Sequence, residues 1–500
     1  MPNKGQKTET DIKIKKQKGK NMQYDRDSYL FYMILHELKD IVGDEYVSTS
    51  FADKTSYAVD YYWVSELWHD RGAKRIEPDF IIFPGTAEEI SKIMVLANEY
   101  KIPVTAWGGG GGSQGGALPI CSGIVIDMKR MNKIISIDFE SMTVEVEAGI
   151  IVQHLEWELA KDDVSTMHYP AAIYCSTIGG FIAHRGTGVL STKYGKMEDM
   201  IVSMEVVLPD GEIISTLPVP KTASGLDLNW FFIGSEGVLG IITRVKLIIH
   251  KIPEVRKFQA FLFKDLASGL ETGRKLMHEG LNPCVIRLYD EPETRSLIKR
   301  VLGIDKEGIY LVYAFDGRKK IVELQHEYAR EIALKLNAED LGTEMGEEWW
   351  LNRYKFFFPP YVFSLPQAFG TCDTVATYKD IEKIYNGMKQ TVETNYPQAR
   401  FIGHFSHWFM WGCMLYARFI IDNPPQDPGE ALHLYNSIWD DVLRSVLSNN
   451  GVLNEHHGIG IKIGRLMKEQ YKNSFSLLKN LKKQLDPNNI MNPGKMGLGF

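Results

Sequence analysis

The stretch from Pro78 to Trp107 changes between strand-like and helix-like spacing of apolar residues. A short apolar run at Phe80–Phe83 is typical of a buried strand, and Thr86 followed by Glu89 indicates a capping box that opens a helix. The helix then carries apolar side chains three and four positions apart, at Ile90, Ile93, Met94 and Ala97. A second apolar run, Val104–Trp107, completes a predicted β-α-β unit.

Short strands continue this pattern as far as about residue 250. Met142–Gly149 alternates as a half-buried strand does, His154–Asp163 predicts a short helix, and Met200–Thr216 predicts a hairpin that turns at Asp210-Gly211. From about 255 to 450 the segments are longer and rich in aromatic residues, with helices such as Lys379–Tyr396. Residues 75 to 250 therefore predict an α+β domain of short mixed strands, followed by a different second domain.

The segment "WGGGGGSQGGA", Trp107–Ala117, has seven glycines in eleven residues. Gly110–Gly115 formally satisfies GxGxxG, but it follows the second strand of its unit and leads through Pro119 into another strand, which is not the dinucleotide-binding context. Consecutive backbone N–H groups without Cβ atoms make a nest for phosphate. A flexible linker is the alternative, although a linker is expected between polar segments and this run lies between apolar strands.

Two later segments are also rich in glycine. Ser176–Gly180, Arg185–Gly188 and Tyr194-Gly195 offer hydroxyl groups, backbone N–H groups and one guanidinium, and Gly234–Gly237 predicts a tight turn. Three glycine-rich turns in one domain indicate an extended ligand that runs through it.

Composition narrows the class of protein. The 500 residues carry a net charge of -6, which argues against a nucleic-acid partner. Five scattered cysteines without a CxxC pair predict reduced thiols in the cytoplasm, with no disulfide or zinc framework. The longest apolar run near the start, "YLFYMIL", is too short for a membrane span, so we expect no integral membrane contact. The lysine-rich residues 1–22 predict a disordered basic tail.

Together these motifs resemble the flavin-binding domain of the vanillyl-alcohol oxidase / p-cresol methylhydroxylase superfamily. The ending "HHGIG…LDPNNIMNPGK" is similar to the C-terminal part of its FAD-linked oxidase branch. The resemblance implies an α+β fold with a two-part FAD-binding domain of the p-cresol methylhydroxylase type and an α+β cap domain that carries the substrate site. The boundaries that follow are a tail at 1–22, an N-terminal helical segment at 23–74, the FAD-binding domain at 75–252, the cap domain at 253–450, and a segment at 451–500 that returns to the flavin.

The same resemblance implies the cofactor site. Pyrophosphate is expected on the first glycine loop and on the "STIGG" turn, and Glu236–Ile241 on the adenosine or isoalloxazine side. The residues expected at FAD are Trp107, Gly108, Gly109, Gly110, Gly111, Gly112, Ser113, Gln114, Gly116, Ala117, Pro170, Ser176, Thr177, Gly179, Gly180, Arg185, Gly188, Tyr194, Glu236, Gly237, Gly240 and Ile241. The glycine loop has no histidine for a covalent link, and Cys175 supplies only half of a double link, so we expect non-covalent FAD.

Three features place the chain within the branch. "SHWFMWGCMLY", Ser406–Tyr416, and "EHHG", Glu455–Gly458, are similar to motifs of alkyldihydroxyacetonephosphate synthase-like proteins, and "VIRLYD" resembles their arginine-bearing strand. The chain departs from them in two ways, because Glu455 stands where a third histidine is expected and Phe356–Phe363 has no arginine. The His-x-Gly-Asp-Gly-Asn-x-His signature of D-lactate and glycolate dehydrogenases is also missing, so we predict no metal site.

The candidate catalytic residues are Tyr416, His456, His457, Arg287 and His407. Tyr416 is the expected acid or base, which needs a cationic or histidine neighbour to act at neutral pH, and the adjacent histidines could provide it. Arg287 is the expected clamp for a carboxylate or phosphate. The alternatives are a core aromatic for Tyr416, packed imidazoles for the histidine pair, and a surface ion pair with Asp290 or Glu291 for Arg287.

A cluster of aromatic residues is core by default but is dense enough to line an apolar pocket: Trp349, Trp350, Phe356, Phe357, Phe358, Tyr361, Phe363, Trp408 and Trp411. We therefore expect a FAD-dependent oxidoreductase that acts on a small hydroxy acid or alcohol and passes electrons to an unknown acceptor. The alternative is an alkyldihydroxyacetonephosphate synthase, a non-redox flavoenzyme, and a third reading is a scaffold that binds FAD without turnover. A homodimer is compatible with each.

Overall fold

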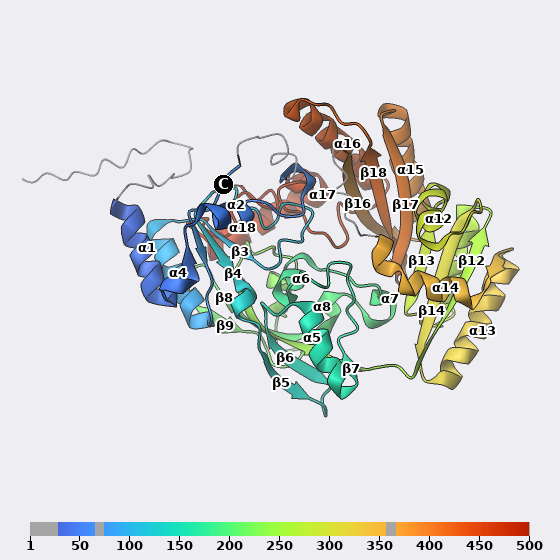
Figure 1. Cartoon of the computed structure of the whole chain (residues 1–500), viewed down its shortest axis with the longest axis horizontal. Coiled ribbons are helices and arrows are strands. Elements are labelled where there is room, and N and C mark those ends of the chain that lie inside the picture. Colours follow the sequence, from blue (N-terminus) through green and yellow to red (C-terminus); the bar gives the residue numbers. More distant parts are fainter. Residues whose placement is uncertain (1–28, 66–74, 357–366, 500) are drawn as a thin grey trace, which may run out of the picture.

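The computed structural model of the chain describes residues 29–65, 75–356 and 367–499. The predicted basic tail at 1–22 lies outside these ranges, as do Phe357, Phe358, Tyr361 and Phe363 of the aromatic cluster. Within the described residues the chain forms a mixed α+β fold (Figure 1).

The predicted β-α-β unit is confirmed. Strand β2 (Phe80–Ile82) leads through helix α4 (Ala87–Tyr100) into strand β3 (Val104–Trp107). Thr86 accepts a hydrogen bond from the Glu89 N–H at 3.2 Å, and the Glu89 carboxylate accepts one from the Gly85 N–H at 2.6 Å. The two strands are not direct neighbours, because β4 (Ile124–Asp127) pairs in parallel with both and lies between them.

The first sheet has the order β1-β2-β4-β3, with the short strand β1 (Val47–Ser48) antiparallel at its edge. The N-terminal helices α1 (Tyr29–Val42) and α2 (Phe51–Ser56) lie before and after β1 along the chain, and both contact β2. α1 and α4 share an apolar cluster with this sheet, which includes Ile34, Phe80 and Ile90. Helices have therefore formed in the segment for which we predicted them.

An antiparallel five-stranded sheet follows, in the order β5-β6-β10-β8-β9. The predicted hairpin through Asp210-Gly211 is its β8–β9 edge. Its strands are β5 (Ile134–Asp138), β6 (Thr143–Glu147), β8 (Ile201–Val207), β9 (Ile213–Ser215) and β10 (Ile241–Ile248). The helices between them are α5 (Val152–Leu159), α6 (Ile178–His184), α7 (Ser191–Tyr194), α8 (Met197–Met200) and α9 (Asn229–Phe232). Short strands β7 (Val164–Ser165) and β11 (His250–Lys251) form a separate pair.

The cap is a seven-stranded antiparallel sheet, shown at the right of Figure 1. Its order is β15 (Glu339–Leu341), β12 (Val255–Phe263), β14 (Ile309–Gly317), β13 (Val285–Tyr289), β17 (Ala399–Trp408), β18 (Gly412–Ile421) and β16 (Ala368–Thr377). Its main helices are α10 (Leu266–His278), α13 (Lys319–Lys335), α14 (Gly342–Leu351), α15 (Ile381–Asn395) and α16 (Pro428–Ser448).

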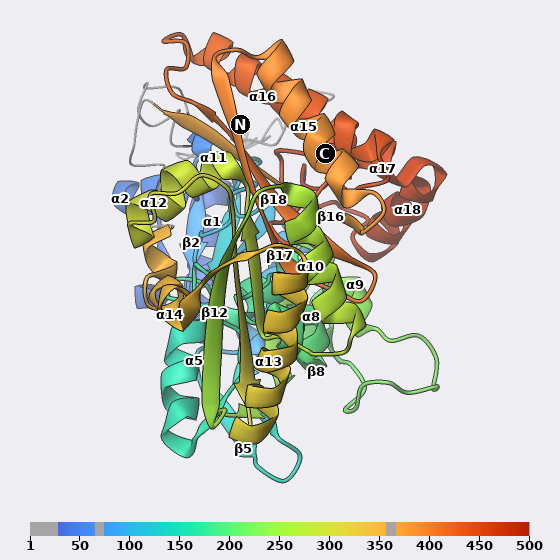
Figure 2. The ribbon, with the colours of Figure 1, turned by 90° about the vertical axis from the view of Figure 1, so that its right-hand side faces the viewer.

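Alternation along these strands assigns each face of the cap sheet. Leu415, Ala417 and Phe419 of β18 belong to a large apolar cluster together with residues of α15 and α16, which lie along the sheet in Figure 2. The intervening residues of β18 point to the other face, because side chains alternate along a strand. That second face is turned toward the FAD-binding part, and it carries most of the predicted catalytic residues.

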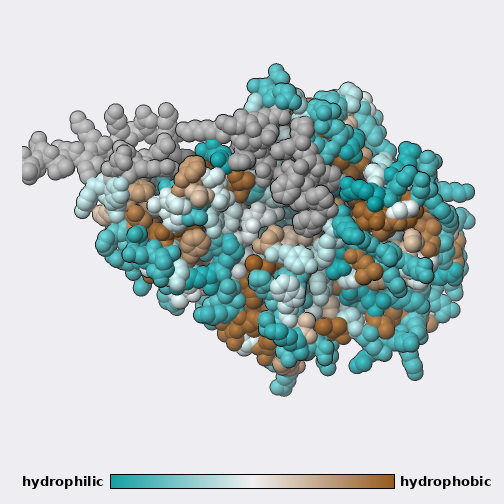
Figure 3. Space-filling view, in the orientation of Figure 1, coloured by the Kyte–Doolittle hydropathy of each residue, from teal (hydrophilic) through white to brown (hydrophobic). Residues whose placement is uncertain are grey.

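The C-terminal segment contains α17 (Met467–Tyr471) and α18 (Phe475–Leu485), and the residues after α18 return to the first sheet. It adds a bridge to the first sheet, where the Val104 N–H donates to the Ile490 carbonyl and the Asn492 N–H donates to the Val104 carbonyl, both at 2.7 Å. None of the described helices combines the length and apolar composition that a membrane crossing needs. Hydrophilic residues cover most of the face in Figure 3, with apolar side chains in separate small groups.

Candidate active site

A cavity of about 760 Å³ lies between the FAD-binding part, the cap sheet and the C-terminal segment. Its lining includes the first glycine loop, the "STIGG" turn and the Glu236 turn on one side. On the other side it includes residues of β13, β16, β17 and β18 and the histidines at 456 and 457. The three glycine-rich turns therefore do border one extended cavity, as expected for a long ligand.

Close packing between two turns explains the glycines at the start of the loop. A Cβ atom on Gly109 would lie 2.0 Å from the Cys175 carbonyl oxygen, and one on Gly108 would lie 2.4 Å from Thr177 Oγ1. Gly110 adopts φ +64°, which favours glycine. At Gly112, in contrast, a Cβ atom would meet no atom of the described residues within 4 Å beyond its chain neighbours, so the missing side chain leaves open space toward the cavity.

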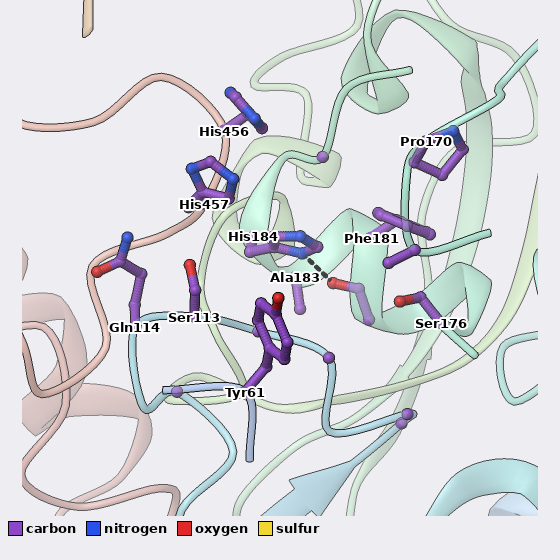
Figure 4. A pocket seen from close by; sticks show the side chains of 18 of the residues that line it. Tyr61, Ser113, Gln114, Pro170, Ser176, Phe181, Ala183, His184, His456 and His457 are labelled. Atoms are coloured by element: carbon purple, nitrogen blue, oxygen red, sulfur yellow. Dashed lines mark hydrogen bonds between the residues drawn. The ribbon is translucent and has the colours of Figure 1, made fainter. Parts of the chain in front are cut away.

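The polar atoms beside these glycines fit a bound cofactor. Ser113 Oγ and both amide atoms of Gln114 are buried and have no hydrogen-bond partner among the residues that the structure describes, and both side chains line the cavity (Figure 4). Buried polar groups normally have a partner. A phosphate or a flavin ring would supply donors and acceptors to them, so the residues present fit FAD.

Most of the residues expected at the cofactor border this cavity. They are Trp107, Gly108, Gly109, Gly110, Gly111, Gly112, Ser113, Gln114, Gly116, Ala117, Pro170, Ser176, Thr177, Gly179, Gly180, Gly188, Glu236, Gly237, Gly240 and Ile241. Glu236 also holds the C-terminal segment, because its carboxylate accepts hydrogen bonds from the backbone N–H groups of Ile459 and Gly460.

Two of the expected cofactor residues do not line the cavity. Arg185 forms an ion pair with Glu198 at 2.8 Å, and its side chain is 46% exposed. The Tyr194 hydroxyl donates to Asp316 Oδ1 at 2.9 Å. Each side chain has a carboxylate partner and lies outside the cavity lining, and a contact of either residue with FAD stays a prediction.

The five candidate catalytic residues, Tyr416, His456, His457, Arg287 and His407, all line the cavity. Register explains part of this grouping, since Tyr416 of β18 lies opposite His404 of β17 and Asp373 of β16. The rings of His404 and Tyr416 stack at 4.7 Å with an interplanar angle of 12°. One row across three strands therefore presents an imidazole, a phenol and a carboxylate.

Two buried arginines face the cavity with different partners. Arg418 donates to Glu293 Oε1 at 2.5 Å, and His404 Nδ1 lies 3.1 Å from the other oxygen of that carboxylate. Arg287 has no carboxylate within 4.0 Å among the described residues, and its one hydrogen-bond contact is 3.4 Å to His404 Nε2. The alternative of a surface ion pair with Asp290 or Glu291 is therefore not found within the described ranges, and Arg287 is only 8% exposed in the cavity wall.

A second cluster joins the C-terminal histidines to two carboxylates. His456 Nδ1 lies 2.7 Å from Glu455 Oε2 and 3.2 Å from Asp373 Oδ2, and His457 Nδ1 lies 2.6 Å from Asp373 Oδ1. Lys196 Nζ lies 2.9 Å from Glu455 Oε1. The cluster is therefore held together by hydrogen bonds and ion pairs. That it binds no metal ion stays a prediction.

Burial and charge set different protonation states within the site. Burial raises the pKa of Tyr416, although Arg418 opposes the shift, so the phenol is protonated at neutral pH. The expected lowering of its pKa by neighbouring histidines is therefore not found. Burial lowers the pKa of His407 to about 4 and also lowers that of His457. Burial acts in the same direction on His456, but Asp373 and Glu455 outweigh it and raise its pKa to about 9.

Several cavity residues were not among the candidates. His184 lies at the centre of the site in Figure 4, where its Nδ1 contacts the Gly180 carbonyl at 2.6 Å, so Nε2 is left toward the cavity. Arg418 lies two positions after Tyr416, and strand alternation alone would have placed it on the same face. Tyr61, which also lines the cavity, and Asp373, which contacts both histidines without lining it, come from distant segments, and no local signal marks them.

Comparison with known proteins agrees with this geometry. Residues 78–217 match the FAD binding domain family, and residues 252–496 match the C-terminal domain of FAD linked oxidases. The chain belongs to the FAD-linked oxidase family. FAD is its cofactor, and the resemblance inferred from the motifs is confirmed.

The relatives of this FAD-linked oxidase carry different activities in their names. Alkyldihydroxyacetonephosphate synthase of Trypanosoma brucei brucei is 31% identical over 468 residues, which cover 86% of this chain and 75% of the synthase. Mitochondrial D-lactate dehydrogenase [cytochrome] of Arabidopsis thaliana is 29% identical, with 84% and 73% covered. The crystal structure of p-cresol methylhydroxylase with substrate bound superposes with a TM-score of 0.76 at 18% identity, covering 94% and 97%, which confirms the fold.

Proposed function

We propose that this FAD-linked oxidase oxidises a small hydroxy acid or alcohol that binds between the flavin and the polar face of the cap sheet. The observation that carries the proposal is the buried Arg287, which borders the same cavity as the glycine loops and has no carboxylate partner within the described part of the chain. A buried cation without a counter-ion is costly, and a substrate carboxylate would supply the missing charge through a bidentate hydrogen bond.

Two side chains of the site differ in protonation at neutral pH: His457 is neutral and can accept a proton, whereas Tyr416 keeps its proton. When bound, FAD would supply the two-electron oxidising capacity needed at the carbon bearing the hydroxyl group. His457 accepts the hydroxyl proton at Nε2, since its Nδ1–H is directed at Asp373 and its lowered pKa keeps it neutral. Tyr416, which keeps its proton, donates a hydrogen bond that orients the substrate oxygen. A hydroxy acid thereby becomes a keto acid, with the proton on His457.

A second candidate is an alkyldihydroxyacetonephosphate synthase, favoured by the 31% identical relative and by the Ser406–Tyr416 motif. Two differences support the oxidase instead. Glu455 replaces an expected histidine, and no arginine occurs in Phe356–Phe363. A phosphate dianion needs more positive charge than a carboxylate does, and the second buried arginine, Arg418, is already neutralised by Glu293.

Anaerobic mixing with a panel of substrates separates these candidates. The purified yellow protein is treated with hydroxy acids, aromatic alcohols and glycerol phosphates while the flavin absorbance is followed. We expect bleaching with at least one hydroxy acid or alcohol and recovery of the absorbance when a redox dye is added. An adduct spectrum with an acyl dihydroxyacetonephosphate, and no electrons passed to the dye, would identify the synthase instead.

We further propose that FAD is held without a covalent bond. Cys175 borders the cavity, but the glycine loop has no histidine that could form a second link. Acid precipitation of the protein should therefore release the yellow colour into the supernatant. Colour that stays with the pellet would contradict this proposal without affecting the proposed reaction.

A further inference from the structure

One ring nitrogen in the histidine–carboxylate cluster faces two negative charges. His456 Nδ1 lies within hydrogen-bond reach of Glu455 and of Asp373, at 2.7 and 3.2 Å. An ionised carboxylate only accepts hydrogen bonds, so Nδ1 must carry the hydrogen. The nitrogen that remains for a ligand is Nε2, and the ring lines the cavity beside His457 in Figure 4.

We propose that Glu455 is a positioning residue that keeps His456 positively charged, so that the two adjacent histidines act in opposite ways. His456 binds negative charge through its Nε2–H group, while His457, which shares only Asp373, stays neutral and accepts a proton. The roles in catalysis rest on the proposed function, but the charge states do not. This division depends on the glutamate that stands where a histidine is expected from the resemblance.

Glu455 is itself fixed as an anion by its surroundings. Lys196 Nζ lies 2.9 Å from Oε1 and also donates to the Glu455 backbone carbonyl at 2.9 Å. The Glu455 N–H donates to Asp373 Oδ2 at 3.0 Å, which orients the turn. Although burial alone would raise the pKa of Glu455, Lys196 and His407 hold it well below the ordinary value.

The other titratable groups around His456 add little positive charge. The ring centres of His457 and His407 lie 3.9 and 5.4 Å from that of His456. Burial lowers the pKa of His457. It lowers the pKa of His407, and of His184 across the cavity, to about 4. Tyr416 lies 5.9 Å away and is protonated at neutral pH.

Lys462 is another cation near the histidine–carboxylate cluster, and its charge interacts with that of Asp373. Its Nζ lies 3.7 Å from the Trp439 ring, and burial lowers its pKa to about 7, so its charge is partial at neutral pH. The groups in direct contact with His456 Nδ1 are therefore the two carboxylates, and both stabilise the imidazolium.

A charged His456 gives the cavity a second site for negative charge, besides Arg287. Arg287 and His456 together match the two oxygen-bearing groups of a hydroxy acid. One is its carboxylate, and the other is the hydroxyl oxygen, which becomes negative as its proton leaves. Donors placed where charge develops lower the barrier more than donors that bind both states equally. Replacing Glu455 should therefore affect the rate of flavin reduction more than the binding of substrate.

Deuterium exchange at the imidazole C2 position, read by peptide mass spectrometry on the FAD-loaded enzyme between about pH 5 and 10, measures the titration of each histidine separately. In the wild-type enzyme we expect the midpoint of His456 at about 9 and that of His457 below 6.5. In Glu455→Gln the His456 midpoint should fall by at least about one pH unit, a tenfold change in proton affinity. Glu455→His, which restores the expected histidine, should give the same direction.

Glu198→Gln is the matched control, since Glu198 also contacts Lys196, at 3.5 Å, but not His456. Its His456 midpoint should stay within a few tenths of a unit of the wild type, and thermal melting with flavin content establishes that each variant is folded. A wild-type His456 midpoint at or below 6.5 overturns the proposal, as does an unchanged midpoint in both Glu455 variants. A tightly bound divalent metal ion in the purified enzyme would also overturn it.

The exchange measurement needs no substrate, so it separates this inference from the proposed reaction. If the midpoints behave as expected and no hydroxy acid or alcohol bleaches the flavin, the charge assignment holds and the proposed function fails. If a hydroxy acid bleaches the flavin while His456 titrates near 6.5, the function holds and the role of Glu455 is refuted.

Discussion

Unlike Arg418 and Lys196, which pair with Glu293 and Glu455, the buried Arg287 lacks a carboxylate partner among the described residues. If it binds the acid group of the substrate, Arg287→Met should weaken oxalate binding roughly 100-fold, as loss of one side of a buried charge pair does. Arg287→Lys keeps the charge but not the planar fork, so its loss should be about 10-fold. Perturbation of the flavin absorbance by oxalate measures both affinities.

Arg274→Met is the control for that pair of variants. Arg274 is a partly exposed arginine that pairs with Glu271 at 2.6 Å on the surface of the cap, so its removal should leave oxalate affinity unchanged. Equal affinities in the wild type and in Arg287→Met would show that acids bind elsewhere and would remove the main support for a hydroxy acid substrate.

Residue types and their spacing were enough to find the side chains that the structure brings to the cavity, but not their partners. Tyr416 and the histidine pair lie within recognisable sequence motifs. Asp373, which contacts both histidines, precedes them by more than 80 residues and lies in no such motif. Arg185 and Tyr194 show the same limit. The resemblance implies that both lie at FAD, but it gives no indication of Glu198 and Asp316, the carboxylates that they contact.

At the scale of single elements, two glycines of the first glycine loop serve different purposes. Gly109 allows close packing within the protein, whereas Gly112 leaves space where the cofactor can approach the backbone. Gly109→Ala would force a Cβ atom to within 2.0 Å of the Cys175 carbonyl, so the loop must shift, and we expect loss of stability and of FAD together. In Gly112→Ala the new Cβ atom meets nothing within 4 Å in the described ranges beyond its chain neighbours, so the apoprotein should keep its melting temperature. Loss of FAD binding in Gly112→Ala alone would show that the cofactor approaches that backbone.

Flavin content after gel filtration and melting of the apoprotein are the two measurements. The prediction fails if Gly109→Ala binds FAD as the wild type does, because the contact with Cys175 would then not be rigid. Full FAD binding by Gly112→Ala would place the cofactor away from the open end of the loop.

Glu293, the last residue of the short helix α11 (Glu291–Glu293), contacts β17 and β18 through its carboxylate. Glu293 is buried between Arg418 and His404, which hold its pKa below the ordinary value although burial would raise it. Glu293→Gln leaves the Arg418 guanidinium buried without its counter-charge, so the free energy of unfolding should fall by about 3 kcal/mol. Urea denaturation measures this difference.

Glu291→Gln is a close control, two residues earlier. Glu291 is half-exposed and pairs with Arg295 at 3.7 Å, so its loss should change the free energy of unfolding by less than about 0.5 kcal/mol. Equal effects of the two substitutions would mean that the buried network adds no more than a surface ion pair.

Element boundaries were easier to predict than the order of strands. Apolar periodicity and the Thr86–Glu89 cap located α4 and both flanking strands, because those signals depend on neighbours in sequence. The insertion of β4 between β2 and β3 depends on which strands meet in space. The pairing of β13 with β17, more than 100 residues apart, has the same origin, and it brings Arg287 and His404 together.

For the whole molecule, the cavity exists only while the cap and the FAD-binding part stay together, since both contribute to its lining. Asp316 at the end of β14 is one connection between them. Its buried carboxylate is bound by Lys193 of α7 at 2.7 Å, by the Tyr194 hydroxyl at 2.9 Å, and within the cap by Arg256 at 2.8 Å. Two residues of the FAD-binding part and one of the cap therefore depend on a single side chain.

Asp316→Asn keeps the volume of that side chain but removes its charge, so two cations lose their shared partner. We expect the free energy of unfolding to fall by about 3 kcal/mol, as a lower urea midpoint with an unchanged slope, because the two parts still unfold together. Asp305→Asn, at an exposed ion pair with Lys299, should leave the midpoint in place. A biphasic transition, with FAD released in the first phase, would instead mean that Asp316 couples two parts that are otherwise stable alone, and an unchanged midpoint would mean that apolar contacts hold the cap without it.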